Sequence, residues 1–144
     1  MLMRMEHANI TVTDIEAAKR FLKIAFPEFE VRGTGTSRND EHSKRWEHFG
    51  THERYLALEQ LEPSGSTDRA PYRDPGVNHI GFVVEDLRAL RDRLVGAGYR
   101  AGDVNEEGEG PARLRSYIFD DQGMEWEFVQ YLTDDPERMN VYEQ

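Results

Sequence analysis

The sequence predicts an α+β fold built from two copies of one unit, each made of a strand, a helix and three further strands. Three observations carry this prediction. Short runs alternate apolar and polar residues, which is typical of half-buried strands. Two other runs have apolar residues at helical spacing, and each directly follows an aspartate suited to cap a helix, Asp14 or Asp86. The whole order occurs twice in 144 residues, so we expect two packed modules rather than a solenoid.

The first module begins with residues 5–13, where apolar and polar positions alternate as in a strand. A helix is expected from Asp14 to Ala25, because Pro27 marks the end of its apolar stripe. Further strands are expected at 29–32, 45–49 and 54–61, with a polar turn region at 33–40 and a hairpin turn at 50–53.

A segment with several prolines and glycines, residues 62–76, is predicted to link the modules. The second module then repeats the order, with strands at 77–84, 99–104, 113–119 and 124–131, a helix from Asp86 to 96–98, a loop at 105–111 and a turn at 120–123. We therefore expect one domain over residues 1–144, with modules at 3–62 and 77–132 and a tail at 133–144. In the tail, Pro136 suits the first turn of a short helix.

The composition excludes several classes of protein. The chain has no cysteine, which rules out a disulfide framework, a thiol nucleophile and a thiolate metal site. Its net charge of −10 argues against nucleic acid as a partner, because neutralisation of phosphates by cations supplies most of that affinity. No apolar run approaches the roughly 20 residues of a membrane span, and residues 1–6 do not read as a signal peptide. A cytoplasmic location without membrane partners is therefore expected.

Two histidines and two glutamates stand at what look like matching places of the two modules. His7 and His79 lie 72 positions apart, each in an expected first strand. Glu59 and Glu127 lie 68 positions apart, each in an expected last strand. Because alternate residues of a strand share a face, all four are expected on the sheet face turned away from the helices. A sheet curved around that face forms a cup, in which buried carboxylates need partners that a divalent cation supplies.

Two imidazole nitrogens and two carboxylate oxygens suit one divalent ion per site, and this donor set does not choose among Zn, Ni, Co, Mn and Fe. Such an ion leaves positions open for substrate oxygens and acts as a Lewis acid on a carbonyl. A carboxylate beside it can take a proton from the adjacent carbon. The chemistry expected of the cup is proton abstraction next to a carbonyl of a small-molecule substrate.

Each candidate ligand alone has a simpler interpretation, because a single strand histidine or glutamate is more often hydrogen-bonded or exposed than bound to a metal. The four together favour the metal site. Three other histidines are interpreted as solvated residues in or near turns, namely His42, His48 and His52. Four arginines are interpreted as surface charges, with binding of an anionic substrate as the alternative: Arg45, Arg54, Arg113 and Arg115.

These residues resemble the vicinal oxygen chelate (VOC) superfamily, which includes glyoxalase I, methylmalonyl-CoA epimerase, extradiol dioxygenases, and fosfomycin and bleomycin resistance proteins. The resemblance covers about residues 3–132 and is most specific at 78–86 and 119–128. The second stretch is similar to an aspartate–glycine turn followed, four residues after Gly123, by a ligand glutamate. The resemblance implies a glyoxalase/dihydroxybiphenyl dioxygenase-like fold, a curved mixed sheet with its helices outside.

The bacterial type of glyoxalase I uses His, Glu, His and Glu as ligands, and Glu59 completes such a set here. The resemblance thus implies the metal ligands His7, Glu59, His79 and Glu127, with Glu127 or Glu59 as the proton-shuttling base. It also implies a site formed between modules of two chains in a homodimer. It favours a glyoxalase-like lyase or isomerase, with the hemithioacetal of a 2-oxoaldehyde as a candidate substrate.

Other functions stay open. Dioxygenases and fosfomycin enzymes use two histidines and one glutamate, and the epimerase has glutamine where Glu59 stands; Gln60 is adjacent but is expected to face the other way. A metal-free protein that sequesters a small molecule would leave the four candidates without a role. The chain also departs from glyoxalase I, with Phe21 and Leu22 in place of a phenylalanine–tyrosine pair and no recognisable glutathione pattern at 104–111.

Overall fold

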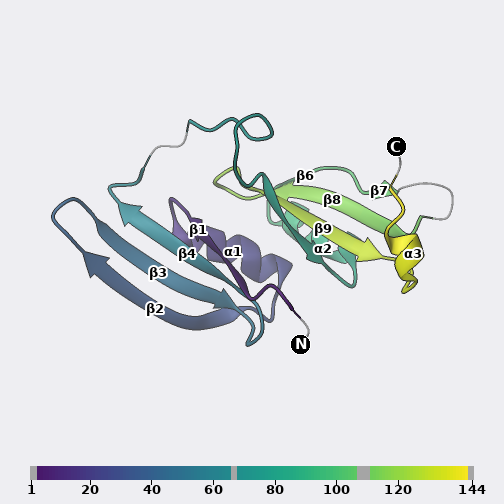
Figure 1. Cartoon of the computed structure of the whole chain (residues 1–144), viewed down its shortest axis with the longest axis horizontal. Coiled ribbons are helices and arrows are strands. Elements are labelled where there is room, and N and C mark those ends of the chain that lie inside the picture. The colour runs from purple at the N-terminus through teal and green to yellow at the C-terminus, as the bar shows by residue number, and fades with distance from the viewer. Residues whose placement is uncertain (1–2, 66–67, 107–110, 143–144) are drawn as a thin grey trace. The chain divides into compact units, whose positions relative to one another are not determined.

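The structure, a computed structural model, describes residues 3–65, 68–106 and 111–142. The chain divides into two compact units, residues 1–69 and 70–144, and each is described by itself. In Figure 1 the first unit runs from purple to teal and the second from teal to yellow. Both units consist of a mixed open sheet with a helix, in the order predicted from the sequence, so the α+β fold class is confirmed. Among the helices described, none is long and apolar enough to cross a membrane.

The first unit is a four-stranded sheet with one helix packed against it (Figure 1). Its elements are β1 (His7–Thr11), α1 (Ile15–Ala25), β2 (Glu30–Arg38), β3 (Ser43–Gly50) and β4 (Tyr55–Glu62). The strand order is β1-β4-β3-β2, with β1 parallel to β4 and the other pairs antiparallel. The apolar stripe of α1 faces the sheet, where Phe21, Leu22 and Leu58 are fully buried.

Strand β2 is longer than predicted, and the polar turn expected at 33–40 is wrong. The strand continues to Arg38, which pairs with Ser43 at the start of β3. Gly35, which read as a turn residue, serves packing instead, because a Cβ there would lie 2.6 Å from the indole nitrogen of Trp46. A glycine in a strand can thus mark a close neighbour on the next strand rather than a break in the chain.

The second unit is a five-stranded sheet that repeats the plan of the first. Its elements are β5 (His79–Val83), α2 (Leu87–Gly96), β6 (Arg100–Ala101), β7 (Asn105–Glu106), β8 (Arg113–Phe119), β9 (Glu125–Tyr131) and α3 (Pro136–Met139). The order is β5-β9-β8-β6, with β5 parallel to β9, and β7 also pairs with β8. The strand predicted at 99–104 is only two residues long. Residues 105–106 of the predicted loop form β7 instead, and residues 107–110 lie outside the described residues.

Short polar contacts fix the ends of these elements. Asp14 accepts the N–H groups of Glu16 and Ala17 in α1, and Asp86 accepts that of Ala89 in α2, so both predicted caps are confirmed. In the predicted turn at 120–123, Asp120 accepts the backbone N–H of Met124 and the indole N–H of Trp126, at 3.0 and 3.1 Å. Gly123 has a φ of 79°, which suits glycine. This turn starts β9, the strand that carries Glu127.

Candidate metal centre

Strands β5 and β9 bring His79 and Glu127 together in the second unit. The strands are parallel neighbours, with His79 opposite Glu125 and Gly81 opposite Glu127. Side chains of paired residues project from one face, so His79 and Glu127 are diagonal neighbours on that face. Nε2 of His79 lies 3.0 Å from Oε2 of Glu127. Trp126 projects to the opposite face, which α2 covers, and is buried there as the alternation predicted.

This pair fits a divalent ion. Two donor atoms bound at right angles, each about 2.1 Å from a metal, lie about 3 Å apart. The two atoms here have that separation, which is also the distance of a hydrogen bond between them when no metal is bound. Gly81 leaves space beside the carboxylate, since a Cβ at that position would lie 3.4 Å from Oε2 of Glu127. An imidazole nitrogen with a carboxylate oxygen suits Zn, Mn, Co, Ni or Fe equally.

Strand β8 places an arginine and a tyrosine beside Glu127. Nε of Arg115 lies 3.9 Å from Oε1 of Glu127, so the two carboxylate oxygens have different neighbours. Tyr117 stands opposite Glu127 in the register, and its ring meets His79 edge-on at 5.4 Å between centroids. Burial, followed by the charge of Glu127, raises the pKa of Tyr117. Its hydroxyl therefore keeps its proton at neutral pH.

Tyr72 is a residue of this cluster that the sequence did not indicate. It belongs to the predicted linker at 62–76, yet its hydroxyl lies 2.9 Å from Nδ1 of His79 and donates to Oε1 of Glu125. The hydrogen bond with Glu125, followed by burial, raises the pKa of Tyr72 to about 12. The prolines and glycines around Tyr72 predict a loop, but composition does not predict which strand a residue of that loop contacts.

In the first unit, His7 stands at the start of β1, opposite Tyr55 of β4. The two rings stack, with centroids 4.8 Å apart, and Nδ1 of His7 lies 3.1 Å from a carboxylate oxygen of Glu6. The side chain of His7 is 43% exposed. The imidazole is therefore held in orientation by a ring and a carboxylate while it stays accessible.

His48 was interpreted as a solvated residue near a turn, and this is wrong. It lies inside β3 and is half-buried, with its ring 4.7 Å from that of Tyr55 and 4.8 Å from that of Trp46. Strand pairing places it on the sheet face turned away from α1, where His7 also projects. His52 does lie in an exposed bend, as expected.

Glu59 does not occupy the place that corresponds to Glu127. In the second unit His79 pairs with Glu125, and Glu127 lies two residues after Glu125. In the first unit His7 pairs with Tyr55, and the residue two positions after Tyr55 is Ala57. Glu59 lies four residues after Tyr55, which places it about 13 Å from Tyr55 along the strand at about 3.3 Å per residue.

Glu59 has other partners at its place in the sheet. Its Oε1 accepts a hydrogen bond from Nδ2 of Asn9 at 3.2 Å and lies 3.3 Å from Nζ of Lys44. The interpretation that Glu59 and Glu127 hold equivalent places is therefore wrong. Whether Glu59 binds the metal stays a prediction.

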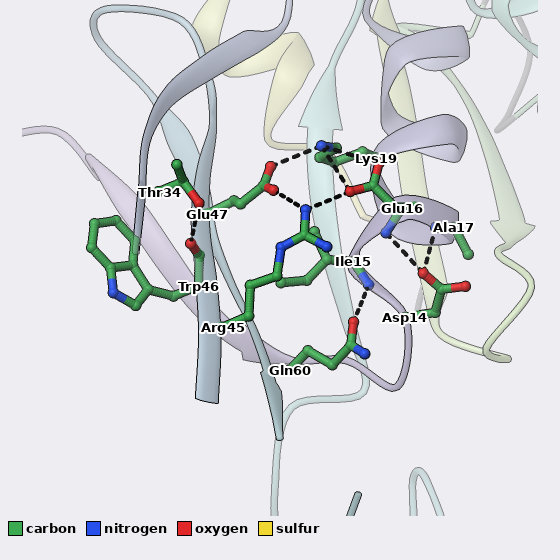
Figure 2. A network of polar contacts seen from close by, with 10 residues as sticks. All are labelled: Asp14, Ile15, Glu16, Ala17, Lys19, Thr34, Arg45, Trp46, Glu47 and Gln60. Carbon is green, nitrogen blue, oxygen red and sulfur yellow. Dashed lines mark hydrogen bonds and ion pairs between the residues drawn. The ribbon is translucent and has the colours of Figure 1, made fainter. Parts of the chain in front are cut away.

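Two glutamines independently support the conclusion that Glu59 and Glu127 are not at equivalent positions in the two units. Oε1 of Gln60 accepts the N–H of the first residue of α1 at 2.9 Å (Figure 2), and Oε1 of Gln130 accepts that of the first residue of α2 at 2.9 Å. The two glutamines thus play the same part in the two units. The residues before them, Glu59 and Val129, are then equivalent, and the partner of Glu127 in the repeat is again Ala57. Gln60 also faces the helix, as predicted.

A sequence model of the Glyoxalase/Bleomycin resistance protein/Dioxygenase superfamily matches residues 4–128. The chain belongs to this superfamily. Among solved structures, it is similar to a glyoxalase family protein from Bacillus cereus, with a TM-score of 0.75 and 20% identity over 92% of this chain and 97% of that one. No curated protein matches the chain in sequence.

Two further solved structures show the same fold. A glyoxylase/bleomycin resistance protein/dioxygenase domain from Frankia sp. EAN1pec has a TM-score of 0.69 and 22% identity, over 91% of this chain and 99% of that one. The fosfomycin resistance protein FosX from Listeria monocytogenes, complexed with Mn(II) and sulfate, has a TM-score of 0.63 and 14% identity, over 98% of this chain and 100% of that one. At identities this low, the structural similarity shows that the chain shares the fold of these proteins.

The four ligands that the superfamily resemblance implies come from both units. His7 and Glu59 lie in the first, His79 and Glu127 in the second. Over residues 3–65, 68–106 and 111–142, no three histidine, aspartate or glutamate side chains gather closely enough to hold an ion. Of the four predicted ligands, His79 and Glu127 are therefore the pair that one unit brings together by itself, and the metal site stays a prediction.

The four arginines have different environments. Arg45 binds Glu16 and Glu47 on the helix side of the first sheet, and Arg54 is exposed beside Glu53. Arg113 is buried, with its guanidinium 4.6 Å from the ring centre of Tyr142, so it is not the surface charge predicted. Of the four, Arg115 is the one that lies beside the candidate metal centre.

Proposed function

We propose that this chain is a metal-dependent enzyme of glyoxalase type, a lyase or isomerase that moves a proton on the carbon next to a carbonyl. The observation that supports it most is the 3.0 Å approach of Nε2 of His79 to Oε2 of Glu127, on a half-exposed sheet face. His7 is proposed as a further ligand. When bound, the divalent ion would supply Lewis acidity toward a substrate carbonyl oxygen.

The protein groups beside this pair have roles of their own. Glu127 is the proposed base, because it has one oxygen toward His79 and a second that is not engaged there. Arg115, whose Nε lies 3.9 Å from the second oxygen, would attract an anionic substrate toward it. Tyr117 keeps its proton and can donate it in a hydrogen bond to a substrate oxygen.

The place of Glu59 supports a second candidate function. Glu59 is the proposed fourth ligand or alternative base of a glyoxalase-type site. The position equivalent to Glu127 in the first unit is occupied by Ala57, however, and alanine cannot bind a metal. A site with His7, His79 and Glu127 alone would match the two histidines and one glutamate used by fosfomycin enzymes and dioxygenases of the superfamily.

A metal titration separates the two candidates. By calorimetry, the wild type is expected to bind about one Mn(II) or Co(II) per site, and His79→Ala and Glu127→Gln to weaken binding about 100-fold or more. In a four-ligand site Glu59→Gln weakens binding comparably, whereas in a three-ligand site its effect stays within about threefold. Glu53→Gln is the control, since Glu53 is exposed beside Arg4. Wild-type protein that takes up none of Mn, Co, Ni or Zn would overturn the metal proposal in favour of a metal-free binding protein.

The loaded enzyme is then offered substrates of both classes. The hemithioacetal of methylglyoxal and glutathione tests the glyoxalase-type reaction, and fosfomycin with water or a thiol tests the three-ligand alternative. Turnover of the hemithioacetal that is lost in Glu127→Gln is the expected result. Light scattering of the purified protein tests the proposal that the site forms within a homodimer.

A further inference from the structure

We propose that Tyr72, together with Glu125, positions the imidazole of His79 for metal binding. The inference deepens the proposed function and rests on it in taking a metal as the group that His79 binds. Tyr72 touches neither of the proposed ligands' donor atoms, Nε2 of His79 and the carboxylate of Glu127, so it acts through the orientation of the ring.

The loop that carries Tyr72 is closed and anchored. The N–H of Asp74 donates to the carbonyl of Ala70 at 2.9 Å, and the N–H of Ala70 donates to Oδ2 of Asp74 at 2.7 Å. The N–H of Tyr72 donates to Oδ1 of Asn78, the residue before β5, at 2.7 Å. These bonds tie the loop to the strand that begins with His79.

The conformation of Tyr72 is not explained by core packing. Its φ of 64° is left-handed, a backbone conformation that is unfavourable for a residue with a Cβ. Its side chain is 62% exposed, so burial of the ring does little to offset that cost. What the conformation achieves is contact of the hydroxyl with His79 and Glu125. An unfavourable backbone conformation that places a side chain in a polar contact is more typical of a functional position than of a linker.

The hydrogen bonds of Tyr72 place a hydrogen on Nδ1 of His79. The hydroxyl has one hydrogen and donates it to the carboxylate of Glu125, which only accepts. Its lone pair therefore faces Nδ1 of His79, 2.9 Å away, and Nδ1 carries a hydrogen. Nε2 faces the carboxylate of Glu127, 3.0 Å away, so it is the nitrogen that can bind a metal together with Glu127. A carboxylate that supports a ligand histidine through its other nitrogen also raises the basicity of the ligand.

The first test is metal affinity. Tyr72→Phe keeps the ring and removes the hydroxyl, and we expect its Co(II) dissociation constant to rise about 10- to 100-fold, with a changed Co(II) absorption spectrum. Glu125→Gln keeps an acceptor oxygen and should lose less than Tyr72→Phe. Tyr142→Phe is the matched control, because Tyr142 is as exposed as Tyr72 and should leave affinity and spectrum unchanged. Equal affinity and spectrum for Tyr72→Phe and the wild type would overturn the proposal.

The second test needs no metal, so it separates failure of this inference from failure of the proposed function. Nitrogen-15 NMR of the metal-free protein at pH 8 should show Nδ1 of His79 protonated in the wild type and unprotonated in Tyr72→Phe. The same protonation of Nδ1 in both proteins would contradict the proposal, even if both bind metal. If Tyr72→Phe does not fold, Glu125→Ala removes the acceptor instead and should give the same change at Nδ1. A wild type with Nδ1 protonated but no metal uptake would contradict the proposed function alone.

Discussion

Glu47 is a carboxylate on the side of the first sheet that α1 covers, and it is only 4% exposed. Figure 2 shows it between two cations: Nζ of Lys19 lies 2.8 Å from Oε2, and the guanidinium of Arg45 binds Oε1. Both cations also bind Glu16 in the first turn of the helix. Two cations for one buried carboxylate offset its loss of hydration. The network therefore fastens α1 to β3 by charge, beside the apolar contacts.

The outer carboxylate of this network responds to pH in a defined direction. The hydrogen bond from Arg45, followed by that from Lys19, lowers the pKa of Glu16. A carboxyl group whose pKa is lower in the folded state stabilises the fold above its ordinary pKa. That contribution is lost as the pH falls through the lowered value.

Replacement of Glu47 by glutamine should weaken the first unit. Glu47→Gln removes the charge but keeps the shape, which leaves Lys19 and Arg45 facing a neutral amide at a buried position. The free energy of unfolding should fall by about 1–3 kcal/mol, less than for a fully buried pair because both cations reach water. Urea unfolding measures the change. Glu53→Gln, at an exposed pair with Arg4, should change it by less than about 0.5 kcal/mol, and an equal effect of the two substitutions would show that the buried network adds nothing.

At the scale of elements, both units share one contact: a glutamine on the last strand of the sheet, Gln60 on β4 or Gln130 on β9, caps the helix of its own unit. Asp14 binds the N–H groups of Glu16 and Ala17, and Gln60 binds the remaining N–H of Ile15 (Figure 2). An N-terminal turn leaves its first N–H groups without partners inside the helix, so a strand residue that binds one both satisfies it and fixes the helix on the sheet.

Removal of either glutamine should loosen its helix. Gln60→Leu and Gln130→Leu leave the first N–H of α1 or α2 without its acceptor, and we expect each to lower the free energy of unfolding by about 1 kcal/mol. Gln60→Glu keeps an acceptor oxygen and should lower it less. Hydrogen exchange gives the specific signature, because the amide of Ile15 should exchange faster in Gln60→Leu while that of Leu87 is unchanged. Unchanged exchange at Ile15 would contradict the capping role.

Elements that follow from local patterns were predictable from the sequence. Asp14 and Asp86 cap helices because a short acceptor before an apolar stripe has that role in most contexts. The alternation around Glu127 predicted which face it occupies, because Trp126 must be buried. The register of β4 was not predictable, because a strand shifted by two residues keeps the same faces. Until the pairing with β1 is known, the sequence therefore cannot show that Ala57, and not Glu59, stands at the position equivalent to Glu127.

At the scale of the whole molecule, the duplication was visible in the order of elements, while contacts between distant segments were not. Tyr72 shows why. Its partners, His79 and Glu125, lie seven and 53 positions away, and only the closed loop at Ala70 to Asp74 brings the hydroxyl to them. The same holds for Lys19 and Glu47, whose contact depends on how α1 packs on the sheet. Side-chain pairs of this kind follow from tertiary packing, which sequence periodicity does not encode.

The last prediction concerns the stability of the whole chain. A metal that binds only the folded protein stabilises it by about 2.7 kcal/mol when its concentration is 100 times the dissociation constant. For a chain of this size that corresponds to a rise in Tm of about 5–10 °C. Mn(II) should produce this rise in a thermal melt, EDTA should reverse it, and His79→Ala should abolish it.

The control for this melt is set by the charge of the chain. A net charge of −10 attracts any cation to the surface, so Mg(II) at the same concentration serves as the comparison. Mg(II) prefers oxygen ligands and several waters, and a site that includes His79 should take it up poorly. Equal shifts with Mn(II) and Mg(II), or a shift that survives in His79→Ala, would mean that the ions screen the acidic surface and do not occupy the centre at His79 and Glu127.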